Sequence, residues 1–198
     1  NALTVIDVER QRRLNTVLLD DVDLGAANPW GIACTADGRY LCVTHAGTNE
    51  LSVIDRPALH RRLKRAADGR QVTAFTDEAA DVKNDLSFLA DIRRRIRLRG
   101  TGPRALAIVG HTAFTAEYFS GTLGAVDISA DRPEARSVAL GPTKEMTTAR
   151  RGEKLFHDAT ICYQQWQSCA SCHPGGRTDG LNWDLLNDGM GNPKNTKS

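Results

Sequence analysis

Three short stretches decide the fold of this chain: LTVID at residues 3–7, LSVID at residues 51–55 and LGAVD at residues 123–127. Each is a run of apolar and β-branched residues that ends in aspartate, and their starts lie 48 and 72 residues apart. A second pair of similar stretches precedes the later two copies, PWGIA at residues 29–33 and PRALA at residues 103–107. Short strands that recur with a period in the forties are typical of propeller blades, each a four-stranded antiparallel sheet.

Turn residues join these strands into hairpins. Asp37-Gly38 separates residues 31–35 from 40–44, and Ser120-Gly121 separates residues 113–119 from 123–127. Residues 1–25 then supply two outer strands of one blade, residues 28–65 most of a second and residues 103–140 a third. The sequence therefore predicts a mainly β fold, with a partial β-propeller of about two to three blades over residues 1–140. Because a closed propeller needs at least about four blades, we expect sequence outside this chain to complete the ring.

The longer second interval predicts an insertion between blades. Val82, Leu86, Leu89, Ile92 and Ile96 fall on one helical face, so an amphipathic helix is expected within about residues 66–98. Five arginines gather at its end, between residues 93 and 99. Arginine near a helix C-terminus also complements the helix dipole, and no aromatic platform accompanies the run, so a nucleic-acid partner is not expected.

The β pattern stops after Gly141-Pro142, and residues 144–157 read as a helix. Residues 144–198 are predicted to form a small α-helical cytochrome c-type domain, truncated at the end of the chain. The prediction rests on Cys169-Ala170-Ser171-Cys172-His173, because Cys-x-x-Cys-His is the attachment signal for haem c. In that arrangement Cys169 and Cys172 form thioethers with the porphyrin, and His173 ligates the iron on the proximal side.

Two other readings of the motif stay open. Cys162, Cys169, Cys172 and His173 could together bind zinc, although adjacent Cys172 and His173 rarely both reach one tetrahedral ion. A redox-active dithiol is the other reading, but it belongs in a βαβ setting that is missing here.

The sixth iron ligand separates an electron-transfer haem from a reactive one. Downstream of the motif the candidate distal ligand is Met190; upstream, the candidates are Met146 and His157. Arg177 could pair with a haem propionate, because a guanidinium matches a carboxylate bidentately. Trp166 and Trp183 could pack on the porphyrin.

Composition is that of an ordinary globular protein, with a formal net charge of +2, so no strong field points to nucleic acid or an anionic membrane. No apolar run is long enough to span a bilayer. Cys34 and Cys42 flank a predicted turn and could form a disulfide, or could be two small buried strand residues. Haem c attachment implies a periplasmic or otherwise extracytoplasmic bacterial location. The chain begins in mid-pattern and ends in a loop-like stretch, so we expect a fragment or a processed product.

With these residues in hand, two resemblances can be stated. Residues 151–158, 168–173, 177–180 and 191–196 resemble the first haem domain of bacterial di-haem cytochrome c peroxidases and the related methylamine-utilisation di-haem enzymes. Residues 1–140 resemble YVTN-type β-propeller repeats. The first resemblance implies a second haem c beyond Ser198 and a peroxide-reactive haem held by His173. The peroxidases often have a distal histidine after the motif, whereas this chain has Met190 there.

Three functions follow as hypotheses. The first is a di-haem peroxidase-like oxidoreductase whose propeller positions a substrate or a redox partner protein, with peroxide as a reactant. The second is an electron-transfer cytochrome with a six-coordinate haem. The third is a surface-binding propeller with an accessory cytochrome domain.

Overall fold

The computed structural model describes residues 1–142, 145–178 and 180. The chain is mainly β, with two four-stranded antiparallel sheets and one two-stranded hairpin, which agrees with a propeller-like fold. The strands are β1 (Ala2–Asp7), β2 (Arg12–Leu18), β3 (Pro29–Cys34), β4 (Tyr40–His45), β5 (Glu50–Asp55), β6 (Arg93–Arg97), β7 (Pro103–Val109), β8 (Thr112–Glu117), β9 (Thr122–Asp127) and β10 (Ala135–Ala139). The helices are α1 (Arg56–Ala67), α2 (Thr148–His157) and α3 (Cys169–Cys172), with 3-10 turns η1 (Val82–Asn84), η2 (Tyr163–Gln165) and η3 (Pro174–Gly176).

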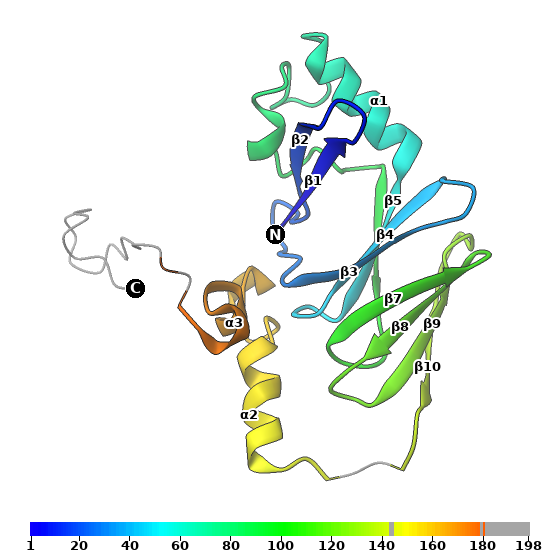
Figure 1. Cartoon of the computed structure of the whole chain (residues 1–198), viewed down its shortest axis with the longest axis vertical. Coiled ribbons are helices and arrows are strands. Elements are labelled where there is room, and N and C mark those ends of the chain that lie inside the picture. Colours follow the sequence, from blue (N-terminus) through cyan, green and yellow to red (C-terminus); the bar gives the residue numbers. More distant parts are fainter. Residues whose placement is uncertain (143–144, 179, 181–198) are drawn as a thin grey trace, which may run out of the picture.

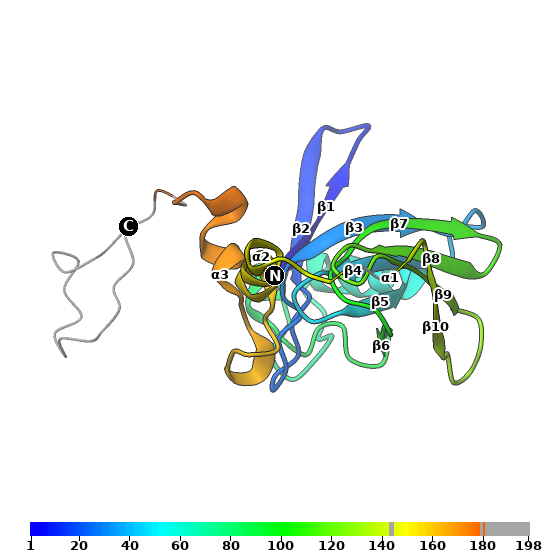
Figure 2. The same cartoon turned by 90° about the horizontal axis from the view of Figure 1, so that it is seen from below.

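Both complete sheets run in chain order, β3-β4-β5-β6 and β7-β8-β9-β10. The predicted turn at Asp37-Gly38 lies where β3 meets β4, and Gly38 has the positive φ of 69° that such a turn requires. Strands β3 and β7 lie beside each other, so the two sheets meet along their first strands (Figure 2). Between the sheets lies one apolar core, formed by Cys42, Leu51, Val53, Ile96, Leu98, Ala113, Val126, Ile128 and Ala135.

The prediction of a helix within residues 66–98 is wrong. The helix of this part of the chain is α1, which ends at Ala67. It begins at Arg56, because the Asp55 side chain accepts a hydrogen bond from the Ala58 amide at 2.7 Å and caps the helix. After α1 the chain is irregular apart from η1. The buried Asp85 carboxylate accepts hydrogen bonds from Thr73, Thr76 and Ser87, and these local bonds compete with a helical backbone.

Apolar residues of this irregular segment still reach a core. Val82, Phe88 and Leu89 are buried beside α1, together with Leu59 and Leu63. Val82 and Leu89 of the predicted apolar face are therefore buried in this core, whereas Phe88 lay outside that face and Ile96 packs in the other core. The arginine run becomes strand β6, which pairs with β5 at the edge of the sheet.

A separate α-helical cytochrome c domain is not supported. The described part of residues 144–198 contains only α2, α3 and two short turns, and neither helix has a buried residue. These elements lie along one flank of the propeller, beside the chain start (Figure 1). Among the described residues of the segment, α2 and α3 contact each other, and backbone hydrogen bonds such as that from Ala159 to Gly47 join the segment to the β region.

Cys34 and Cys42 are both free thiols, which answers the question of a disulfide. The register pairs Cys34 with Leu41 and Cys42 with Ala33, so the two cysteines lie on opposite faces of the sheet. Cys42 is fully buried, and burial raises the pKa of its thiol to about 12. Within the described residues, no helix is long and apolar enough to cross a membrane.

Candidate functional site

The Cys-x-x-Cys-His motif folds into the single helical turn α3. Cys169 and Cys172 are its first and last residues, and residues three apart on a helix share one face. His173 follows directly, with its backbone amide bonded to the Cys169 carbonyl at 2.9 Å. His173 Nδ1 lies 3.2 Å from the Arg177 carbonyl oxygen. Both thiols are free; Cys169 is exposed and Cys172 half-buried. The two sulfurs and the imidazole are thus presented from one short segment.

Asn28, the residue before β3, joins this turn to the propeller by hydrogen bonds. Its side-chain amide donates to Ser168 Oγ at 2.7 Å and to the His157 carbonyl at 3.3 Å. Its side-chain oxygen accepts from Ser171 Oγ at 2.7 Å. Asn28 has a φ of 54°, a left-handed conformation that asparagine tolerates better than most residues.

Backbone contacts extend the same junction on both sides. The Ala159 amide donates to the Gly47 carbonyl at 2.9 Å, and the Gly25 amide donates to the Gln164 carbonyl at 2.8 Å. A Cβ atom at Gly25 would lie 2.4 Å from the Trp166 Cα, so only glycine permits this approach. The C-terminal segment is therefore held against the propeller by several residues far apart in sequence.

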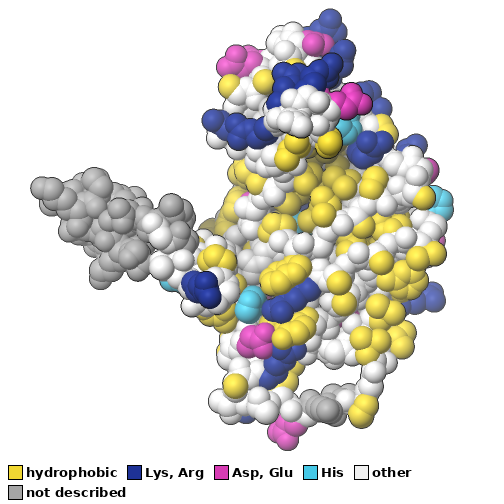
Figure 3. Space-filling view, in the orientation of Figure 1, with side chains coloured by type: hydrophobic (Ala, Val, Ile, Leu, Met, Phe, Trp, Pro, Cys, Tyr) yellow, Lys and Arg dark blue, Asp and Glu magenta, His cyan; other side chains and the backbone are white. Residues whose placement is uncertain are grey.

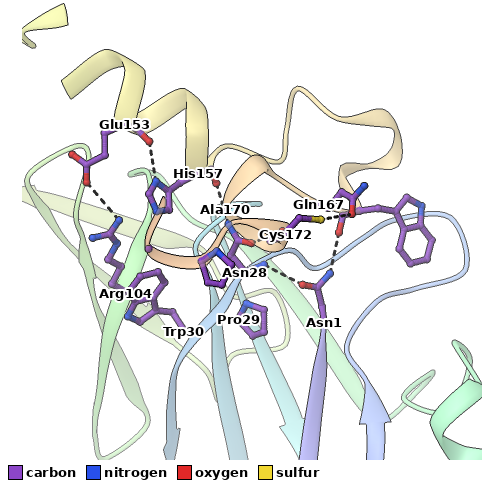
Figure 4. Close-up of a pocket in the computed structure, with 14 residues that line it drawn as sticks. Asn1, Asn28, Pro29, Trp30, Arg104, Glu153, His157, Gln167, Ala170 and Cys172 are labelled. Atoms are coloured by element: carbon purple, nitrogen blue, oxygen red, sulfur yellow. Dashed lines mark hydrogen bonds and ion pairs between the residues drawn. The ribbon is translucent and has the colours of Figure 1, made fainter. Parts of the chain in front are cut away.

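A cavity of about 670 Å³ opens between α2, α3 and the first residues of β3 and β7 (Figure 4). This volume lies in the range of small-molecule and cofactor sites. The C-terminal segment lines it with Glu153, His157, Trp166, Gln167, Ala170, Ser171, Cys172, Pro174 and Gly175. The propeller lines it with Asn1, Asn28, Pro29, Trp30 and Arg104. Cys172 of the motif therefore faces a space whose far wall is the propeller.

Arg104 is the charged group on the propeller wall. Its guanidinium carbon lies 4.5 Å from the Trp30 ring centroid and 3.8 Å from that of Tyr118. Its nearest acidic group is Glu153, at 3.8 Å. Arg104 Nε is buried and has no hydrogen-bond partner among the described residues. Figure 3 shows basic, acidic, histidine and hydrophobic side chains gathered where α2 meets the sheets.

Glu153 is shared between two arginines. It lies 2.7 Å from Arg150, which itself stacks on Tyr118. Partial burial raises the pKa of Glu153, but the hydrogen bond and charge of Arg150 outweigh it and hold that pKa below its ordinary value. Glu153 is therefore ionised at neutral pH and balances part of the positive charge at this wall.

His157, the last residue of α2, lies at the same cavity. Its Nδ1 is 2.9 Å from the Glu153 carbonyl oxygen, one helical turn earlier. Its ring contacts Phe156 and Phe119, with centroids 5.3 and 5.8 Å away. These contacts hold the imidazole in place at the cavity edge.

Of the residues expected around a haem, the structure brings Cys172 and Trp166 to the cavity, with Cys169 and His173 on the same turn. Arg177 is exposed and does not line the cavity; only its carbonyl is used, by His173. Trp183 and Met190 lie outside the described residues. Met146 and Cys162 do not line the cavity.

The sequence reading missed Asn28, Trp30 and Arg104. The available signal was the repeat itself, because Trp30 and Arg104 are both the second residue of a Pro-initiated first strand. Equivalent positions of neighbouring blades reach the same end of a propeller-like fold. The zinc reading receives no support, since the described residues contain no group of three or more His, Cys, Asp or Glu that could hold a metal ion.

No family model matches this chain. One stretch of 49 residues is 51% identical to the hydrazine synthase subunit gamma of Kuenenia stuttgartiensis, which covers 24% of this chain and 14% of that protein. A chain of the solved Kuenenia stuttgartiensis hydrazine synthase superposes with a TM-score of 0.55 at 23% identity. That superposition covers 66% of this chain and 36% of the other. A functionally unknown protein from Desulfotomaculum acetoxidans DSM 771 has a TM-score of 0.45, too low to support an argument.

These likenesses correct the expected family. The di-haem peroxidase resemblance of residues 144–198 is wrong as an assignment, because the curated relative is a hydrazine synthase subunit and the described part of that segment forms no helical cytochrome domain around the motif. The structural likeness shows a propeller-like fold. This chain spans well under half of the length of either relative.

Proposed function

We propose that this chain binds one haem c and serves as a redox component of a multi-subunit enzyme complex. Cys169 and Cys172 bond the porphyrin, and His173 Nε2 ligates the iron. The observation that carries the proposal is the position of the motif: α3 borders a cavity of about 670 Å³ that the propeller closes from the other side. When bound, the group supplies one-electron chemistry at its iron.

The chain's own side chains bind and orient this group. Trp30 and Trp166 line the cavity and supply apolar surface there. Arg104 offers a guanidinium to an acidic substituent, and this role replaces the one expected of Arg177. Asn28 binds both serines of the α3 turn and so holds Cys172 at the cavity, with Cys169 and His173 on the same turn. The propeller wall shields that side from water.

Two further parts of the proposal rest on likeness and on the chemistry of attachment. Both matched proteins are named as hydrazine synthase, a redox enzyme. One of them is named as its gamma subunit, and this supports the proposal that the present chain has a partner protein. Covalent haem attachment takes place outside the cytoplasm, so we place the protein in an extracytoplasmic compartment.

The haem proposal is tested by exporting the chain in a host with c-type haem maturation machinery. The mature protein is expected to carry the mass of one haem and a Soret band that survives acid–acetone extraction. The double variant Cys169→Ala/Cys172→Ala should lose both signals. The matched control Cys34→Ala/Cys162→Ala removes two other thiols and should keep them. An exported, folded wild-type chain without haem would overturn the proposal.

The complex is tested separately on the natural protein. Purification under mild conditions from its own source should return it with other polypeptides in fixed ratio. A haem-loaded protein that elutes alone at every salt concentration tried would contradict the subunit role and leave the haem proposal standing.

A further inference from the structure

A second cavity, of about 620 Å³, lies between the β1-β2 hairpin and α1, which stand together at one end of the molecule (Figure 1). It is at the other end of β1 from the cavity beside α3, because Asn1 lines that cavity and Asp7 lines this one. The Asn15 side chain donates to the Ala79 carbonyl at 2.7 Å and so joins the hairpin to the segment that follows α1. The volume is again that of a small-molecule site.

One stripe of α1 forms a wall of this cavity. His60, Leu63, Lys64 and Ala67 are spaced three or four residues apart, so they share one face of the helix, and all four line the cavity. Leu63 is buried, whereas His60 and Lys64 are exposed. The wall therefore combines apolar surface with a positive charge.

The charges around the cavity are unequal. Four permanent cations line it, those of Arg10, Arg12, Arg13 and Lys64, against the single carboxylate of Asp7. Asp7 lies opposite Arg12 in the hairpin, but its carboxylate accepts from Arg10 at 2.9 Å. In the part of the chain that the structure describes, no carboxylate lies within ion-pair distance of Arg12, Arg13 or Lys64. Lys and Arg side chains accordingly gather at this end of the surface (Figure 3).

An ordinary structural role accounts for only part of this charge. Lys64 lies in the last turn of α1, where the helix dipole favours a cation. Arg12 and Arg13 belong to a strand, β2, and have no such role. They also differ from Arg93 and Arg95 of β6, which are paired with carboxylates of the chain. Arg12 and Arg13 are therefore available to an external anion.

We propose that this cavity binds an organic phosphate, with Arg12, Arg13 and Lys64 around the phosphate and the apolar part of the ligand against Leu14 and Leu63. A guanidinium matches phosphate oxygens bidentately, and a lysine adds a point charge. The leucines give the ligand an apolar surface that inorganic phosphate would not use. This site is separate from the cavity beside α3 and does not rest on the haem proposal.

His60 provides a readout inside the cavity. Burial, together with the charge of Arg56, lowers the pKa of His60 below its ordinary value. A bound phosphate stabilises the protonated imidazole, so the pKa of His60 should rise when the ligand is present. Titration followed by nuclear magnetic resonance measures this change, and the ring signals of His111, in an exposed turn outside the cavity, serve as the reference.

The test is calorimetric titration of the full chain with ADP as the probe, at about 0.15 M salt. ADP should bind and raise the pKa of His60, and adenosine, which lacks the phosphates, should do neither. Arg12→Gln/Lys64→Gln should weaken ADP binding by about tenfold or more. Arg61→Gln/Arg70→Gln removes the same charge from exposed residues outside the cavity and should bind ADP as the wild type does.

Vesicles of phosphatidylglycerol distinguish a lipid headgroup from a free phosphate as the source of the ligand. Sedimentation with these vesicles that Arg12→Gln/Lys64→Gln abolishes, without binding of ADP, would support the site and assign it to a lipid headgroup. Equal weakening in the two double variants would show a general effect of surface charge and overturn the proposal. Binding of adenosine as tight as that of ADP, or no binding of either ADP or vesicles, would overturn it as well.

Discussion

At the scale of single residues, the repeat places unlike polar groups at equivalent buried positions. His45 is the last residue of β4 and lies opposite Pro29, whereas Glu117 is the last residue of β8 and lies opposite Pro103. Glu117 accepts hydrogen bonds from the Gly100 amide and from hydroxyl groups. Both side chains are buried, and each finds partners in its own blade. The blades share a backbone pattern but differ in how they satisfy buried polar atoms.

His45 makes two hydrogen bonds, from Nδ1 to the Ala26 carbonyl at 2.9 Å and from Nε2 to Ser52 Oγ at 2.8 Å. Burial, together with the smaller effect of the Arg95 charge, lowers the pKa of His45 to about 3. Unfolded His45 titrates near 6.5, so between pH 6.5 and pH 3 the unfolded chain binds a proton that the folded chain does not. The contribution to stability is complete above pH 6.5 and falls as pH drops through this window.

We therefore expect the free energy of unfolding to fall by about 2 kcal/mol more between pH 7 and pH 5 in the wild type than in His45→Gln. Urea unfolding at both pH values measures the difference. His111→Gln, in an exposed turn, serves as the control and should follow the wild type. Equal losses in the wild type and His45→Gln would show that His45 is not the titrating group.

At the scale of elements, β6 explains the arginine run. Period-2 alternation directs Arg93 and Arg95 to one face of the strand and Arg94 and Ile96 to the other. Arg93 and Arg95 form ion pairs with Asp21, and Arg95 also pairs with Glu50. Arg93 and Arg95 are therefore neutralised by acidic side chains of the same chain and do not indicate a site for an external anion.

Arg95→Ala should destabilise the chain by about 3–5 kcal/mol, because it leaves the Glu50 carboxylate buried without its cation. Arg97→Ala, on the same strand but exposed, should change stability by no more than about 0.5 kcal/mol. Urea denaturation followed by circular dichroism distinguishes them. Similar small losses in both variants would mean that Glu50 finds water or another partner.

At the scale of the whole molecule, the two complete sheets are equivalent but not equally covered. Ile96 of β6 lies opposite Leu51 of β5, and Val138 of β10 lies opposite Leu123 of β9. Ile96 is 5% exposed because the second sheet covers that face, whereas Val138 is 65% exposed. How much an equivalent residue contributes to stability therefore depends on whether a neighbouring sheet covers it, and not on the sequence pattern of its own sheet.

Ile96→Ala should accordingly cost about 2–5 kcal/mol of unfolding free energy, since it empties a packed interface. Val138→Ala, at the equivalent register, should stay within about 0.5 kcal/mol of the wild type. Chemical denaturation at two protein concentrations tests the pair. A large, concentration-dependent loss in Val138→Ala would reveal that self-association covers this face in solution.

Most of the strands and their hairpin turns could be predicted from the sequence, because alternation and Gly-containing turns are local; β6 could not, since its residues were expected in the inserted helix. The helix predicted within residues 66–98 failed because periodicity cannot reveal that the Asp85 carboxylate bonds three hydroxyl side chains and fixes an irregular backbone. Arg177 was expected at the haem for its closeness in sequence, yet the cavity is lined by Arg104 instead.

What the sequence determined by itself is the propeller-like β architecture; the haem attachment role of the two cysteines and His173 is a prediction that the sequence makes and the proposed experiment tests. Only the tertiary structure decided that Asn28, Arg104 and His157 meet at the Cys-x-x-Cys-His turn. These residues come from segments more than 50 residues apart in the chain. They are brought together by burial and by hydrogen bonds between distant backbone groups, and neither leaves a periodic trace in the sequence.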